Sequence, residues 1–346
     1  MDCNTLLKKN VSLKNYNTFG VNVNAKQMYE IQNIKDLQSL FEEGIISNPF
    51  LVLGDGSNIL FTKDFDGTII KINLHGKEIL EDTDKYIKLK ISAGEKLEEI
   101  VKWTVENNLI GIQNLALIPG TIGATPIQNV GAYGVEIKDV LESVEFFDLK
   151  NGIVKTISGL DCEFGYRDSI FKHELKGLAI VTSITIKLEK YKQQELPERY
   201  LAYGDITKEL ESQYSKPYTL ENLYQSICNI RKSKLPDVKE YGSCGSTFQN
   251  PIVSLEQYIE IKKKYESIPS FPTSERNFVK IPAAYILEKL GWKNRRVGKC
   301  GTWTHPLIVT NYDNASPKDI LDVIEQIQKD FYDNIGVRLE TEINII

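Results

Sequence analysis

The chain has 346 residues, of which 41% are apolar and 26% charged, an ordinary composition for a globular protein with about two or three domains. Its net charge of −5 and the lack of a long basic run make nucleic acid and an anionic membrane surface poor candidates for a partner. With only three histidines, most zinc sites and most serine–histidine–aspartate mechanisms are also disfavoured.

The N-terminus and the cysteines indicate where the protein works. The first ten residues contain no apolar core of signal-peptide length, and no run of about 18 apolar residues occurs, so we expect a cytoplasmic protein without a membrane span. The five cysteines form no C-x-x-C pair, which favours free thiols in a reducing compartment over a structural metal. We expect a monomer, because no exposed apolar helix face stands out.

Apolar periodicity predicts both helices and strands in the first half of the chain. Residues 34–43 and 96–107 show the spacing of amphipathic helices. Compact or alternating apolar runs predict strands at 50–53, 68–74, 86–91, 144–149, 153–157 and 179–188. These strands form hairpin-like pairs and do not alternate regularly with long helices, which indicates an α+β architecture.

The second half begins with a polar stretch and then becomes more helical. Residues 189–217 lack sustained apolar periodicity, so we predict a linker or mobile loop there. Residues 338–345 alternate apolar and polar side chains, which predicts a final strand. Helices are predicted at 220–231, after a capping box at Ser254, at 282–290, and from the N-cap Ser316 to Gly336.

Two glycine-rich segments could bring the backbone close to a ligand. The first, LGDGSN at 53–58, matches neither the G-x-G-x-x-G fingerprint nor a Walker A loop, and taken alone it fits a tight structural turn better than a phosphate site. The second, IPGTIGATPIQNVGAYG at 118–134, interleaves glycines with side-chain donors. That pattern suits a large, flat, anionic ligand such as a dinucleotide better than an ordinary surface loop.

Together the two segments resemble the family of UDP-N-acetylenolpyruvoylglucosamine reductases, also called UDP-N-acetylmuramate dehydrogenases. The stretch 189–217, with Tyr203, resembles the substrate-covering loop of the family's longer type. The resemblance continues in family order through NTFG (17–20), SAGE (92–95), GYRDSIFK (165–172), SKLPD (233–237), GSTFQNP (245–251) and LETEI (339–343).

The resemblance implies a fold and a division into domains. Residues 1–188 would form a vanillyl-alcohol-oxidase-type (PCMH-like) FAD-binding domain made of two α+β subdomains, with their boundary near 65–75. Residues 189–217 would be the substrate loop or linker, and 218–336 a smaller α+β substrate-binding domain. The strand at 337–346 is a candidate to return to the first domain.

The resemblance also implies an activity and its cofactors. The reaction would be the NADPH-dependent reduction of UDP-N-acetylglucosamine enolpyruvate to UDP-N-acetylmuramate, a step of peptidoglycan precursor synthesis. FAD would be bound non-covalently, with NADPH as co-substrate. The implied FAD contacts are Gly54, Asp55, Gly56, Ser57, Asn58, Ile59, Pro119, Gly120, Thr121, Gly123, Ala124, Gln128, Asn129, Gly131, Ala132, Tyr133 and Gly134.

Three residues match the family's catalytic positions. Reduction of an enol ether that carries a carboxylate needs a hydride, a fixed group to stabilise the charge that develops on the carboxylate, and a proton donor. The resemblance implies that Arg167 and Glu342 stabilise the enolate-like intermediate and that Ser246 donates the proton. Without the resemblance, each residue has an ordinary structural alternative. Arg167 could form a surface ion pair, Ser246 could occupy a turn, and Glu342 could be a solvated strand residue.

Two of these catalytic candidates have neighbours of similar chemistry. Their assignment therefore depends on the position of each residue within its motif. Cys244 lies close to Ser246, and Glu340 shares the predicted strand face of Glu342. Thr341 stands where the family usually has proline. His305 lies in a segment that departs from the family pattern, so no contact is carried over there. The implied substrate contacts are Tyr166, Tyr203, Lys234 and Asn250.

Two other functions remain open on sequence grounds. Many relatives in the wider superfamily are oxidases with FAD linked covalently to a histidine or cysteine of the pyrophosphate loop, but neither residue type occurs within 54–59 or 118–134. A non-catalytic nucleotide-sugar-binding protein is disfavoured, because all three candidate catalytic residues are present.

Overall fold

The computed structural model describes residues 7–47, 49–192, 195–273 and 275–346. Their contacts divide the chain into two compact units, which we call unit 1 and unit 2. Within the described residues, unit 1 comprises 7–11, 25–55 and 66–233, and unit 2 comprises 12–24, 56–65 and 234–346.

Unit 1 begins with a small sheet and one helix. Helix α1 (Ile34–Glu42) starts at a capping box between Asn33 and Asp36 and confirms the helix predicted there. Strands β3 (Phe50–Leu53) and β5 (Phe65–Ile72) run parallel, with Leu53 opposite Lys71. The strand order is β1 (Leu7–Ser12), β2 (Asn24–Ile31), β5 (Phe65–Ile72) and β3 (Phe50–Leu53).

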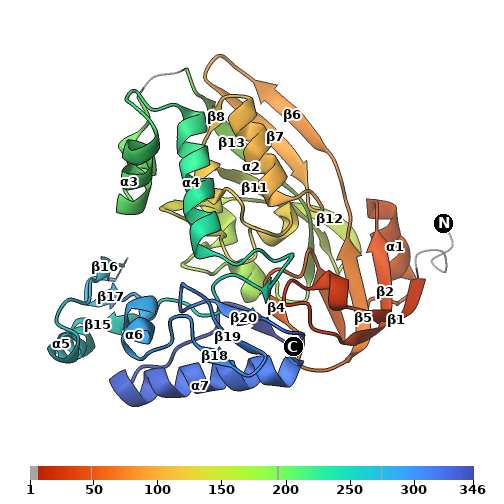
Figure 1. The fold of residues 1–346 in the computed structure, drawn as a ribbon. Helices are drawn as coiled ribbons and strands as arrows, with labels where there is room; N and C mark the ends of the chain where they lie inside the picture. Colours follow the sequence, from red (N-terminus) through yellow and green to blue (C-terminus); the bar gives the residue numbers. More distant parts are fainter. Residues whose placement is uncertain (1–6, 48, 193–194, 274) are drawn as a thin grey trace. The chain divides into compact units, whose positions relative to one another are not determined.

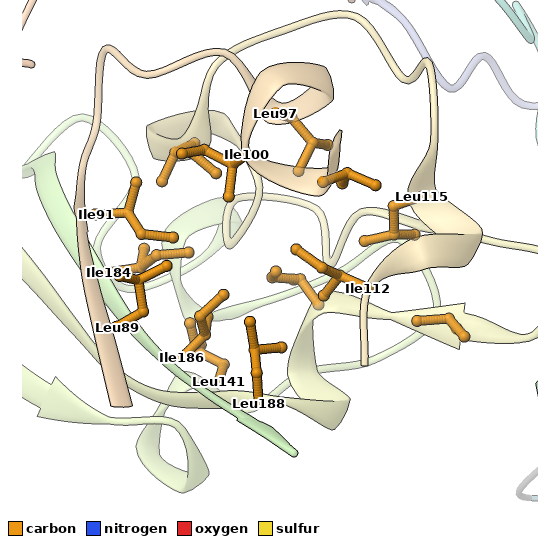
Figure 2. Packing of buried hydrophobic residues seen from close by; sticks show 14 of the residues in the cluster. Leu89, Ile91, Leu97, Ile100, Ile112, Leu115, Leu141, Ile184, Ile186 and Leu188 are labelled. Carbon is orange, nitrogen blue, oxygen red and sulfur yellow. The ribbon is translucent and has the colours of Figure 1, made fainter. Parts of the chain in front are cut away.

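The main core of unit 1 lies on a six-stranded antiparallel sheet. Helices α2 (Leu97–Glu106) and α4 (Leu220–Lys234) lie against this sheet (Figure 1). In Figure 2, Leu97 and Ile100 of α2 point toward Ile91 and Ile184 of the sheet. The strand order is β12 (Ile153–Ser158), β11 (Leu141–Asp148), β13 (Ala179–Lys190), β7 (Tyr86–Ser92) and β6 (Lys77–Asp82), and β8 (Leu109–Ile110) also pairs with β13.

The stretch predicted as a linker is partly regular. Residues 204–213 form helix α3 (Gly204–Gln213), which buries Ile206 and Leu210. Two apolar residues one turn apart are too few to show helical periodicity, so packing against the rest of unit 1 stabilises this helix. The part of the prediction at residues 193 and 194 lies outside the described residues.

One boundary between the compact units falls at the end of α4, between Ser233 and Lys234. Leu223 and Ile227 of this helix are buried in the core of unit 1, so α4 belongs to that unit by its packing. Our predicted substrate-binding domain begins earlier, at residue 218. The assignment of functions to domains stays a prediction.

Unit 2 contains two small antiparallel sheets and three helices. Helix α7 (Pro317–Ile335) begins at the predicted N-cap Ser316 and ends at Gly336, whose φ is 67°. One sheet has the order β14 (Gly242–Ser243), β20 (Val309–Asn311), β19 (Cys300–Thr302) and β18 (Arg296–Val297). The other has the order β15 (Ile252–Ser254), β17 (Phe278–Lys280) and β16 (Phe271–Pro272), and the remaining helices are α5 (Leu255–Lys264) and α6 (Ala283–Lys289).

The single strand predicted at 338–345 is wrong. Thr341 forms an isolated bridge with Phe248, and only Asn344–Ile345 forms a strand, β21, which runs parallel to β4 (Ile59–Leu60). The chain changes partners between these two pairings, which interrupts the strand. Ile345 is 40% exposed, so the alternating pattern does not correspond to one buried sheet face.

Two further observations concern the cysteines and the helices. In the described ranges, Cys162, Cys228, Cys244 and Cys300 are free and buried, and Cys3 lies outside them. Over these same ranges, every helix is too short or too polar to cross a membrane.

The carboxylate of Asp148 is a local point of electrostatic stabilisation at the end of β11. It accepts hydrogen bonds from Lys155 Nζ at 2.7 Å, from the Lys150 backbone N–H at 2.9 Å and from the Asn151 side chain at 2.6 Å. These donors favour the charged form and lower the pKa of Asp148 from 3.8 to about 2. The resulting stability is present above pH 3.8 and is lost as the pH falls through about 2.

We predict that Asp148→Asn lowers the free energy of unfolding at pH 7 by about 1–2 kcal/mol, because the charge-assisted bonds are lost. As the pH falls from about 4 toward 2 the difference from the wild type should shrink, because Asp148 becomes protonated first in the unfolded state and then in the folded state. Urea unfolding of both proteins at several pH values between 7 and 2 measures this difference in the free energy of unfolding. The exposed Asp66→Asn is the matched control and should change little. A difference that stays constant over this pH range would contradict the assignment.

Candidate active site

Three motifs that are far apart in the sequence lie side by side in unit 2. The Glu342 N–H donates to Thr247 O at 2.8 Å, and Gln249 N–H donates to Glu340 O at 2.9 Å. The Asn58 side chain donates to Glu342 O at 3.3 Å. Folding therefore places the segments of two candidate catalytic residues, Ser246 and Glu342, beside the end of the first glycine-rich segment.

Ser246 lies in a turn with a firmly held neighbour. It is half-buried and follows Gly245, whose φ is 70°. The next residue, Thr247, is fully buried; its N–H donates to Leu307 O at 2.8 Å and its hydroxyl accepts from Val309 N–H at 3.1 Å. These bonds fix the backbone that carries the Ser246 hydroxyl.

Cys244 faces the interior of unit 2. Its Sγ lies 3.3 Å from Thr18 Oγ1 and 3.4 Å from Ile59 O. Burial raises the pKa of Cys244 to about 11, although the hydrogen bonds to Thr18 and to Ile59 O act in the opposite direction. The thiol is therefore protonated and engaged within the protein, which favours Ser246 over Cys244 as the acid.

The first glycine-rich segment is held by close backbone contact. Gly56 has a φ of 63°, and a Cβ at this position would lie 2.0 Å from Tyr16 O. Its carbonyl accepts from Thr18 N–H at 3.1 Å, so only glycine allows the two motifs to meet. Ser57 is half-buried and Ile59 is buried.

In unit 1 the two glycine-rich segments touch each other. A Cβ on Gly54 would lie 2.5 Å from Thr121 Oγ1. Gly123 N–H donates to Ala93 O at 2.9 Å within a short 3-10 helix at Ile122–Ala124. Pro119 and Ala124 are exposed, whereas Gly120 is buried.

Asn129 connects the second glycine-rich segment to the motif of Arg167. It is fully buried, and its side-chain amide donates to Glu136 at 2.9 Å and to Gly165 O at 3.0 Å. Gln128 is half-buried next to it. These bonds give Asn129 a structural role that the sequence pattern did not indicate.

A tight hairpin holds Arg167. Strands β9 (Gly131–Ala132) and β10 (Val135–Glu136) are joined by Tyr133 and Gly134, with φ of 50° and 80°, as a type I′ turn requires. Arg167 Nη2 donates to Gly131 O at 3.0 Å. The same guanidinium lies 5.5 Å from the ring centroid of Tyr166.

Tyr203, the tyrosine predicted to cover the substrate, packs on this hairpin. Its ring meets that of Tyr133 edge to face, with a centroid separation of 5.9 Å, and a Cβ on Gly134 would lie 3.2 Å from it. Tyr203 remains 48% exposed. Unit 1 therefore gathers Arg167, Tyr166 and Tyr203 at one glycine-rich hairpin.

Arg231, which belongs to none of the motifs that predicted site residues, also reaches the second glycine-rich segment. Its Nη2 donates to Leu117 O at 3.3 Å. Burial lowers the pKa of Arg231, and Tyr133 offsets this in part, but a guanidinium stays charged. Its Nε is buried and has no hydrogen-bond partner among the described residues. A half-buried cation with a buried, unused donor fits an electron-rich or anionic ligand such as a flavin nucleotide.

The predicted substrate contacts in unit 2 have different surroundings. Lys234, the last residue of α4, is half-buried. Burial lowers the pKa of His305, and the positive charge of Lys234 lowers it further. The two side chains therefore share one electrostatic environment. Asn250 Oδ1 accepts from Ala283 N–H at 3.0 Å, which stabilises the start of α6.

Two family models and a solved structure match this chain. Residues 237–346 match a family model described as UDP-N-acetylenolpyruvoylglucosamine reductase, C-terminal domain, and residues 27–158 match one described as FAD binding domain. The crystal structure of a UDP-N-acetylenolpyruvylglucosamine reductase from Thermus caldophilus has a TM-score of 0.66 at 22% identity and covers 97% of both chains, which confirms the α+β fold.

Relatives in sequence cover almost the whole chain. The UDP-N-acetylenolpyruvoylglucosamine reductase of Flavobacterium johnsoniae is 40% identical over 341 residues, which is 98% of this chain and 99% of that protein. The one of Aliivibrio fischeri is 38% identical over 338 residues, 96% and 93% of the two chains. The expected resemblance is confirmed, and the chain belongs to the UDP-N-acetylenolpyruvoylglucosamine reductase family of flavin-dependent oxidoreductases.

Proposed function

We propose that this protein reduces UDP-N-acetylglucosamine enolpyruvate to UDP-N-acetylmuramate with NADPH and bound FAD, in the synthesis of peptidoglycan precursors. The observation that supports this most is the full-length family match, together with Arg167, Ser246 and Glu342 in motifs that resemble those of the family. We place the enzyme in the cytoplasm, as a monomer.

The two glycine-rich segments would hold FAD, which supplies the hydride that it receives from NADPH. Gly54–Ile59 and Pro119–Gly134 are the candidate cofactor segments, and Arg231 adds a fixed positive charge next to the second of them. Because neither segment contains histidine or cysteine, FAD would be bound without a covalent link.

Arg167 would bind the carboxylate of the enolpyruvyl group. A guanidinium matches a planar carboxylate through parallel hydrogen bonds and stays charged at any working pH. The bond to Gly131 O orients this group before substrate arrives, which is the condition for strong electrostatic stabilisation of developing charge.

Ser246 and Glu342 would complete the chemistry of the substrate. Ser246 donates a proton to the carbon next to the one that accepts the hydride, and a hydroxyl can do so because that carbon becomes strongly basic. Glu342 would act together with Arg167 to stabilise the enolate-like charge. The pairing of the segments of Ser246 and Glu342 supports a shared role.

The absorption spectrum of the purified protein tests the proposed function. We expect flavin bands that bleach with NADPH and return when UDP-N-acetylglucosamine enolpyruvate is added without oxygen. Acid denaturation should release FAD into the supernatant. Bands that return only with oxygen would favour an oxidase, and a protein without flavin bands that still binds the UDP-sugar would favour a non-catalytic role.

We predict that Ser246→Ala slows reduction of the substrate by about 100-fold or more, because the proton donor is lost. NADPH-driven bleaching of the flavin should keep its wild-type rate. Stopped-flow measurement of the two half-reactions separates these effects. Cys244→Ala is the control, and it should retain substrate reduction because its thiol contacts Thr18 and Ile59 in the interior. The opposite result would assign the proton to Cys244.

We predict that Arg167→Gln lowers kcat for substrate reduction by about 100- to 1000-fold, because preorganised charge at the carboxylate is lost. Lysine should restore only part of the rate, since an ammonium lacks the planar pair of donors. Steady-state kinetics with saturating NADPH measure kcat and KM separately. A variant that changes KM alone would reduce Arg167 to a binding residue.

A further inference from the structure

Two lysines share one carboxylate where the glycine-rich segments of unit 1 meet. Lys96 Nζ lies 2.9 Å from one oxygen of Asp55, and Lys71 Nζ lies 3.7 Å from the other. Asp55 follows Gly54, which touches Thr121 of the second segment. The three charges therefore lie at the contact between the two segments.

Both lysines are carried by elements that build this contact. Lys71 lies on β5 opposite Leu53, the residue before the first glycine-rich segment. Lys96 precedes α2 and forms a backbone bridge with Thr121. Gly120 O accepts from the first amide of that helix, Leu97 N–H, at 3.0 Å. The backbone therefore holds both side chains at fixed places beside the segments.

The charges of this cluster do not balance. The Lys71 side chain is only 11% exposed and that of Asp55 18%, so both are removed from much of the solvent. Burial lowers the pKa of Lys71, and Asp55 offsets this in part. Glu30, the other acid that acts on Lys71, is engaged by Lys8 at 2.5 Å. Two ammonium groups therefore depend mainly on one carboxylate, and a net positive charge remains.

A partly buried ammonium whose shared partner lies 3.7 Å away is costly to the folded protein when it has no further anion. A bound phosphate would remove that cost, because charge-assisted bonds to oxygen anions are strong where water is partly excluded. The chain as a whole is acidic, so local cations of this kind have to attract such a ligand.

Building on the proposed function, we propose that Lys71 and Lys96 bind the pyrophosphate of FAD, in competition with the carboxylate of Asp55. FAD is favoured over NADPH as the source of the phosphate, because the cluster lies beside the segments assigned to FAD. The competing interpretation is a purely structural role, which we call a brace. In a brace, the ion pairs of Asp55 with Lys71 and Lys96 only hold the first glycine-rich segment against β5 and the start of α2.

Dissociation constants of FAD, measured on the full chain by equilibrium dialysis, test the proposal. Lys71→Met and Lys96→Met should each raise the dissociation constant by about 5- to 20-fold at low ionic strength, and by less than about 3-fold in ~0.5 M salt. Binding of riboflavin, which has no phosphate, should change by less than about 2-fold. Lys102→Met is the matched control on α2, because Lys102 is exposed and pairs with Glu106.

Asp55→Asn separates the two interpretations by the sign of its effect. If the lysines serve the phosphate, removing the competing carboxylate should tighten FAD binding by about 2- to 5-fold at low salt. A brace would instead make Asp55→Asn weaken FAD binding as the lysine variants do, and that result would overturn the proposal.

Two further outcomes are decisive. Unchanged FAD binding in both lysine variants, with a raised NADPH dissociation constant in flavin reduction, would assign the phosphate to NADPH and overturn the FAD assignment. If Lys71→Met does not fold, Lys71→Arg, which keeps the charge, should bind FAD within about 3-fold of the wild type at low salt. Failure of the wild type to bind FAD would refute the proposed function itself.

Discussion

Close approach of backbone to backbone at the glycine-rich segments is the constraint on which the candidate active site depends. A side chain at Gly56 would overlap Tyr16 O, and one at Gly54 would overlap Thr121. Without these contacts the segment of 53–58 could not meet the NTFG motif in unit 2 or the second glycine-rich segment in unit 1. Such glycines cost conformational entropy on folding, and the hydrogen bonds around them offset that cost.

In the proposed function, local charge rather than net charge would attract the anionic ligands of this acidic chain. Arg167 is oriented by Gly131 O, Arg231 reaches Leu117 O with a buried donor left over, and Lys71 shares Asp55 with Lys96. Each cation is held next to a glycine-rich segment by backbone geometry. Because the groups are partly desolvated, each interacts more strongly with a bound anion than a solvated side chain would.

The elements that sequence analysis located best have strong local signals. Helix α7 combines a capping box, a proline at its first position and a terminal glycine, and its ends were predicted correctly. The predictions failed where distant partners decide the structure. At 338–345 the chain leaves its pairing with Phe248 and joins Ile59, so alternation did not produce one strand. Helix α3 depends on burial of Ile206 and Leu210 rather than on periodicity.

The amino-acid sequence alone was sufficient for the family and the α+β class, because motif order and spacing survive in the linear chain. The catalytic residues that it suggests stay a prediction. Only the tertiary structure showed that buried Asn129 links the second glycine-rich segment to Gly165 and that Cys244 faces the interior. It also showed that Arg231 and Lys71 lie beside the glycine-rich segments. These roles depend on contacts between residues far apart in the chain, and no local pattern of side chains encodes such contacts.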